Sequence, residues 1–172
     1  ENAYLSTCPI LTQAFVYGNP FKNYLVGVVG VDVPAMKKSI ERDEIHFRGI
    51  HSNSSYYEAF QKLKSLLGSN SEKDELELLK LINSHTFLKK TILNFLNKQI
   101  QDISKSEGKK LLQSFEKIHN LYLAVNPLTI ENNLITPTFK VKRNVCGEYF
   151  KDRLDLLYDE GSLIKDDRAA KL

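Results

Sequence analysis

The chain has 172 residues, of which 42% are hydrophobic, and these values predict a single domain with a real hydrophobic core. The formal net charge is +3, and Lys and Arg are scattered among Asp and Glu. A nucleic-acid partner usually needs a concentrated basic face, so this pattern argues against one. No apolar run approaches the roughly 20 residues that span a bilayer, so no membrane span is expected in this segment.

Cysteine and histidine usage argues against a metal centre. Cys8 and Cys146 lie far apart and lack metal-ligand spacing, and the four histidines form no ligand motif. Two reduced thiols in an intracellular protein are the simpler interpretation, with a disulfide between them as the alternative.

The first part of the chain predicts a hairpin behind a short helix. Residues 1–5 read as the end of a helix that Pro9 closes. Residues 13–17 are β-prone, and residues 24–31 are too continuously apolar for a strand with one wet face. We expect the two strands to pair as an antiparallel hairpin, with the second covered on both faces.

Helices dominate the middle of the chain. Pro34 opens a short helix, and residues 43–70 are rich in His, Ser, Asn and Tyr, which predicts an insertion that is partly mobile on the surface. Ser71 begins a capping-box pattern ahead of a helix that reaches Leu81. The longest helix is predicted to begin at Ser84, where an amphipathic pattern starts.

The last third returns to strand and then to helix. Residues 118–125 alternate as a third strand, and a helical stripe follows from Val145 to Leu157. The charged tail, residues 159–172, is expected to be mobile. The predicted fold class is therefore α+β: a small, mostly antiparallel sheet of three strands with helices packed on it.

Residues 131–143 present a lysine from a restrained loop. Asn132 favours a turn, and Pro137 prevents a helix from running through the segment. Lys140 follows with Lys142 and Arg143 directly behind it, a placement that suits phosphate and carboxylate oxygens. From the charge pattern alone, a solvated basic turn is the favoured interpretation.

Four segments carry a resemblance to a known family. They are residues 1–5, residues 13–18 with 25–29, and, most closely, residues 128–138. In this order and spacing they resemble the C-terminal domain of eukaryotic long-chain fatty acyl-CoA synthetases, which are adenylate-forming (AMP-binding) enzymes. The block 43–70 departs from the family. Where other adenylate-forming enzymes have Thr-Gly-Lys, this chain has Phe139 before the lysine, which favours the long-chain branch.

The resemblance implies that the whole chain, residues 1–172, is the C-terminal lid domain of a larger ligase. Such a ligase converts a long-chain fatty acid, ATP and CoA to acyl-CoA through an acyl-adenylate. Lys140 matches the catalytic lysine, which enters a site built by a large N-terminal adenylation domain of the same chain. ATP, Mg²⁺ and CoA would bind mostly to that larger domain. Lys142 and Arg143 would contact a phosphate of nucleotide or CoA, or pair with acidic groups across the domain interface.

The same resemblance sets expectations for the parent protein. The chain begins at Glu1 without methionine or signal-peptide pattern, which fits a fragment that is inactive alone. The parent is expected to be intracellular, with association to the cytosolic face of the endoplasmic reticulum or another organelle as a family expectation.

Two other functions compete with the ligase. A stand-alone protein-interaction module would use the helical block 43–70 for docking and leave the basic turn incidental. A small RNA-binding α+β domain would need exposed strand aromatics beside basic residues, an interleaving that Phe15, Tyr17 and Tyr122 do not show. A phosphate-binding loop and a hinge encoded upstream of Glu1 would favour the ligase over the module.

Overall fold

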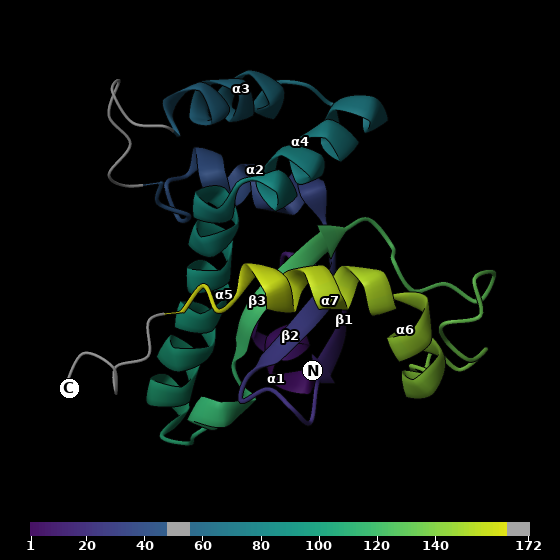
Figure 1. Cartoon of the computed structure of the whole chain (residues 1–172). Helices are drawn as coiled ribbons and strands as arrows, with labels where there is room; N and C mark the ends of the chain where they lie inside the picture. The colour runs from purple at the N-terminus through teal and green to yellow at the C-terminus, as the bar shows by residue number, and fades with distance from the viewer. Residues whose placement is uncertain (48–55, 165–172) are drawn as a thin grey trace.

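A computed structural model of the chain describes residues 1–47 and 56–164. Its helices pack around one central sheet of three strands, which is an α+β arrangement (Figure 1). In chain order they are α1 (Asn2–Thr7), β1 (Leu11–Gly18), β2 (Leu25–Val31), α2 (Val33–Glu41), α3 (Tyr57–Leu67), α4 (Glu72–Ser84), α5 (Thr86–Glu107), the short 3₁₀ helix η1 (Ser114–Glu116), β3 (Ile118–Ala124), α6 (Arg143–Tyr149) and α7 (Lys151–Glu160).

The α+β class and the three strands are confirmed, and the sheet order is β1-β2-β3. β1 and β2 form the predicted antiparallel hairpin, with Phe15 opposite Val28. β3 runs parallel to β2, with Val28 opposite Tyr122, so the sheet is mixed rather than mostly antiparallel. The reason is the long helical excursion between β2 and β3, which lets the chain cross over before it re-enters the sheet.

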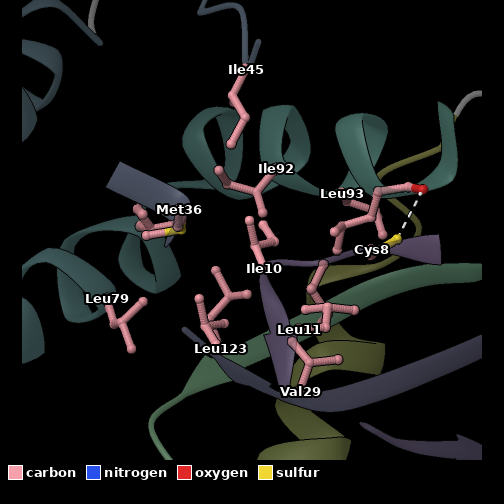
Figure 2. Packing of buried hydrophobic residues seen from close by; sticks show 14 of the residues in the cluster. Cys8, Ile10, Leu11, Val29, Met36, Ile45, Leu79, Ile92, Leu93 and Leu123 are labelled. Atoms are coloured by element: carbon pink, nitrogen blue, oxygen red, sulfur yellow. Dashed lines mark hydrogen bonds between the residues drawn. The ribbon is translucent and has the colours of Figure 1, made fainter. Parts of the chain in front are cut away.

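Both faces of the sheet are buried, as the apolar run in β2 predicts. Its side chains alternate between two cores: Val26 and Val28 face one, and Val29 and Val31 face the other. The larger core lies between the sheet and the helices α1, α2, α4 and α5; Figure 2 shows Val29 and Leu123 from the strands directed towards it. The smaller core lies under α6 and α7, which cross the opposite face in Figure 1.

The helix after the lysine segment is broken where one continuous helix was expected. Phe150 ends α6 and begins α7 with a non-helical backbone, and its ring stacks on Phe15 with centroids 6.2 Å apart. The break lets Cys146 of α6 and Leu154 of α7 both enter the smaller core. Apolar spacing alone does not distinguish one helix from two that share a buried stripe.

The described part of the block 43–70 contributes to the core. Ile45, Ala59 and Leu63 are buried in the larger core, and α3 packs on α4. The predicted mobile loop within this block falls mainly on residues 48–55, which lie outside the described residues. Of the predicted tail, residues 165–172 also lie outside; ahead of them Leu163 is buried, and its amide donates to the carbonyl of His119 at 2.8 Å.

The remaining sequence predictions concern thiols and membrane spans. Both cysteines are free and buried, and burial raises the pKa of each thiol. Over the described ranges, none of the helices has the length and apolar character that a membrane crossing demands.

Candidate functional site

The segment between β3 and α6 is tied to the sheet at its base. The side-chain amide of Gln13 on β1 donates to the carbonyl of Leu128 at 2.7 Å and accepts its amide at 3.0 Å. Asn132 closes the following turn, as predicted, by exchanging hydrogen bonds with Thr129 at 2.9 and 3.0 Å. Leu134 is fully buried in the smaller core, so the segment enters the loop from a fixed position.

The loop that carries the lysine is a narrow hairpin. Ile135 and Val141 form an antiparallel bridge across its neck, and the amide of Lys142 donates to the carbonyl of Leu134 at 2.9 Å. Within the loop, Thr136 donates its amide to the carbonyl of Lys140 at 2.8 Å, and its hydroxyl accepts the amide of Lys140 at 3.0 Å. These bonds restrain the backbone of Lys140 from both sides.

The side chain of Lys140 is exposed beyond this restrained backbone. Its ammonium group has no hydrogen-bond or ion-pair partner among residues 1–47 and 56–164. All three donors of such an ammonium are available to an anion. The bonds across the neck restrict the backbone from which the side chain extends.

The two cations behind Lys140 have partners within the chain. Lys142 donates its ammonium to Oδ1 of Asn133. Arg143 pairs with Glu1 at 2.5 Å, and both residues also bind the peptide groups of Val16: its amide donates to Glu1 at 2.9 Å, and its carbonyl accepts from Arg143 at 3.4 Å. Of the three predicted site residues, Lys142 and Arg143 have side-chain partners, whereas Lys140 has none among the described residues.

Two site features escaped the sequence prediction. The Glu1–Arg143 pair joins residues 142 positions apart, for which no local pattern exists. Phe139 adopts φ +64° with its side chain 75% exposed. The sequence did contain a sign of the second feature, because Phe139 stands where adenylate-forming enzymes, which the chain resembles, commonly have glycine.

The described residues hold no group of three His, Cys, Asp or Glu side chains placed to bind a metal ion.

Relatives of this chain by sequence include acyl-CoA synthetases and acyl-CoA ligases. No protein-family profile matches the chain. It is 32% identical over 160 residues to long chain acyl-CoA synthetase 2 of Arabidopsis thaliana, and 26% identical over 160 residues to the peroxisomal acyl-CoA ligase 891 of Penicillium roqueforti (strain FM164). Each match covers 93% of this chain, and the chain spans only 18% of the length of each relative.

A solved structure shares the fold. The A-PCP didomain of the carboxylic acid reductase from Segniliparus rugosus, in complex with AMP, superposes with a TM-score of 0.51 at 22% identity, covering 93% of this chain and 15% of that one. At this identity the likeness shows a shared fold. The predicted resemblance is confirmed: the chain is related to the C-terminal end of long-chain acyl-CoA synthetases.

Proposed function

We propose that this chain is the mobile C-terminal domain of a long-chain fatty acid–CoA ligase and that it supplies Lys140 for acyl-adenylate formation. The observation that carries the proposal is an exposed ammonium without a partner among residues 1–47 and 56–164, on a loop whose neck is anchored in the core, in a chain related to such ligases. A domain that needed Lys140 for its own stability would have paired it.

The chemistry requires a cation at one step in particular. The fatty-acid carboxylate attacks the α-phosphate of ATP, pyrophosphate leaves, and an acyl-adenylate forms. This step brings two anions together, so a positioned positive charge between carboxylate and phosphate lowers its barrier. The CoA thiol then attacks the acyl carbon and AMP leaves. That second step joins a thiol to a mixed anhydride, and Lys140 is not needed between two anions.

We divide the remaining cations by their contacts. Arg143 is held by Glu1 and Val16, so we assign it to fixing the start of α6 and the lysine loop. The ammonium of Lys142 donates to the neutral Asn133 side chain, so we keep for it the role of binding a phosphate of nucleotide or CoA. Mg²⁺ would accompany ATP, bound through the phosphates and the larger N-terminal domain.

The parent protein is, in this proposal, an intracellular enzyme in which a large N-terminal adenylation domain binds the fatty acid and the nucleotide. After adenylation the small domain rotates, withdraws Lys140 and lets CoA approach. The relatives' greater length supports the larger partner domain, since this chain spans 18% of them.

The experiment uses the longer protein that carries this chain, supplied with a long-chain fatty acid, ATP, Mg²⁺ and CoA. We expect acyl-CoA, AMP and pyrophosphate in equal amounts, and no acyl-CoA from the 172-residue chain alone. Absence of ligase activity in the longer protein would contradict the proposal and favour the interaction module. Acyl-CoA synthesis by the 172-residue chain would contradict the division of labour between domains.

A further inference from the structure

Phe139 has a backbone conformation that suits glycine. Its φ of +64° lies in the left-handed region, where a side chain crowds the following carbonyl. Three other non-glycine residues of the described chain share this region, and they are Asp43, Asn126 and Asn133. Short Asp and Asn side chains tolerate the conformation because they bond nearby backbone, whereas a phenylalanine has no such compensation.

Packing within the domain does little to offset the conformational energy cost of this backbone. The Phe139 side chain is 75% exposed, so most of the ring lies in water. The loop bonds around it hold the conformation in place: its amide donates to the carbonyl of Thr136 at 2.8 Å. A strained backbone that presents an exposed aromatic ring points to a use outside the domain itself.

An apolar recess of about 300 Å³ lies beside the ring. Its lining is mostly apolar and includes Phe139 itself; the other lining residues are Leu5, Ala14, Leu128, Ile135 and Val141, with the polar Thr12 and Gln13. Leu5 is also partly exposed, at 38%. The ring and the recess together form an apolar surface next to Lys140, and exposed apolar surfaces of this kind are typical of contact sites.

We propose that Phe139 is a docking anchor, which seats the lysine loop on an apolar surface of the larger N-terminal domain during adenylation. This inference rests on the proposed function. The occupant is argued from the length of the chain, which spans 18% of its relatives, and from the proposed function, in which the adjacent Lys140 reaches a site on the larger domain. An apolar side chain of that larger domain would enter the recess between Phe139 and Leu5.

The anchor would act by positioning. Consecutive Cα atoms are about 3.8 Å apart, so fixing the Phe139 ring fixes the origin of the Lys140 side chain. An error of about 1 Å in a catalytic group costs on the order of 100-fold in rate. Phe139 therefore adds to catalysis through Lys140, without contacting the reacting atoms itself.

The test compares Phe139→Gly and Phe139→Leu in the longer protein, with each half-reaction measured separately. We expect Phe139→Gly to slow acyl-adenylate formation by about 10- to 100-fold and to leave thioester formation from supplied acyl-adenylate within about twofold. Phe139→Leu keeps an apolar side chain and should retain most of the adenylation rate. In the 172-residue chain, Phe139→Gly should keep or raise the melting temperature, because glycine relieves the strained φ.

Phe21 provides the matched control, since it is 92% exposed in the loop between β1 and β2, away from the lysine loop. Phe21→Ala should change neither half-reaction, and equal losses from Phe21→Ala and Phe139→Gly would overturn the anchor. A lower melting temperature for Phe139→Gly would also overturn it, because the ring would then stabilise this domain.

Lys140→Ala in the same assay separates the two hypotheses. Full adenylation by Phe139→Gly together with loss in Lys140→Ala would refute the anchor and leave the proposed function standing. Full adenylation by Lys140→Ala would refute both.

Discussion

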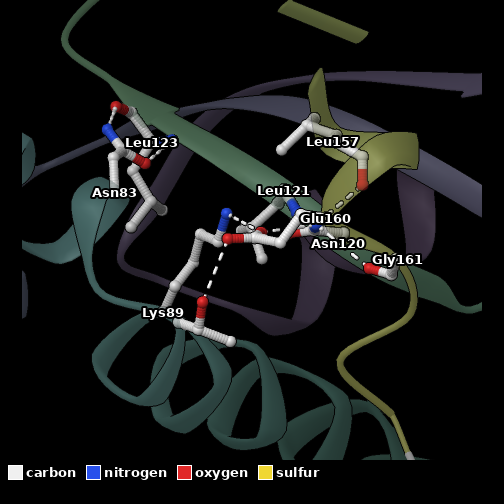
Figure 3. A network of polar contacts seen from close by, with 9 residues as sticks. Asn83, Lys89, Asn120, Leu121, Leu123, Leu157, Glu160 and Gly161 are labelled. Atoms are coloured by element: carbon white, nitrogen blue, oxygen red, sulfur yellow. Dashed lines mark hydrogen bonds and ion pairs between the residues drawn. The ribbon is translucent and has the colours of Figure 1, made fainter. Parts of the chain in front are cut away.

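Lys89 and Lys140 are treated in opposite ways by the same fold. Lys89, on α5, is 3% exposed and forms an ion pair with Glu160 at the end of α7 (Figure 3). Glu160 also accepts hydrogen bonds from Asn120 at 2.7 Å and from Thr86 at 3.1 Å. Lys140 is exposed, and its ammonium forms no hydrogen bond or ion pair with the described residues. The network around Lys89 joins α5, α7 and β3, whereas the ammonium of Lys140 has no such partner within the described residues.

The difference shows where the buried polar interactions of this domain are concentrated. A buried ammonium must be paired because an isolated charge in a low-dielectric interior is very costly. Asn120, fully buried on β3, extends the same network by donating to the carbonyl of Leu157 at 3.0 Å. The network fixes α7 against the sheet, and α6 and α7 cover the core from which the lysine loop extends. The buried network therefore stabilises the base of the lysine loop, and the Lys140 ammonium is not part of that network.

For folding, the largest expected effect comes from breaking the buried pair. Lys89→Ala removes a buried side chain and its charged hydrogen bond to Glu160; because the Glu160 side chain is 29% exposed, we expect a loss of about 2 kcal/mol in the free energy of unfolding. Urea unfolding of the 172-residue chain measures it. Lys98→Ala is the matched control on the same helix, because Lys98 pairs with Asp102 at 3.1 Å in solvent and such pairs contribute less than about 1 kcal/mol. Equal losses for the two variants would contradict the contrast.

A smaller effect is expected in acid. Burial alone would raise the pKa of Glu160, but hydrogen bonds from Lys89 and Asn120 outweigh it and hold that pKa below its ordinary value of 4.5. The stability that this carboxylate adds is therefore complete above about pH 5 and is lost as the pH falls through the lowered folded value. Urea unfolding at several pH values should show a shallower acid loss in Glu160→Gln than in the wild type. Parallel pH profiles would show that this group does not contribute.

The smallest effect on folding is expected at the exposed lysine. Lys140→Ala should change the free energy of unfolding by no more than about 0.5 kcal/mol, since it removes no contact described within the domain. Lysine-selective methylation of the 172-residue chain sharpens the same contrast: Lys140 should react early and Lys89 late. Slow reaction of Lys140, or a large loss of stability on its removal, would show that it serves the domain itself.

Local signals predicted much of this fold. The continuous apolar run of β2 indicated a central strand with both faces covered, and Ser71 caps α4 as its pattern predicts, accepting the amide of Asp74 at 3.1 Å. Asn132 and Pro137 indicated a loop that presents Lys140, and the structure has that loop. These features depend on residues that are close in sequence, so local sequence patterns are enough to predict them.

Long-range pairing escaped prediction for the opposite reason. The Lys89–Glu160 contact spans 71 residues, and neither side chain stands out in its own helix. The parallel direction of β3 depends on the path of the whole helical excursion. The positive φ of Phe139 is held by the hydrogen bonds that Thr136 forms with Phe139 and Lys140. Residue propensities do not predict these bonds.

The most direct test of the account is the effect of Lys140→Ala on the two half-reactions of the longer protein, with Lys142→Ala beside it. The account predicts that Lys140→Ala slows acyl-adenylate formation by about 100-fold or more, while thioester formation from supplied acyl-adenylate stays near the wild-type rate. Lys142→Ala should mainly raise the KM for ATP or CoA. Equal losses in both half-reactions for Lys140→Ala, or no loss in either, would contradict the claim that this domain lends a free cation to adenylation.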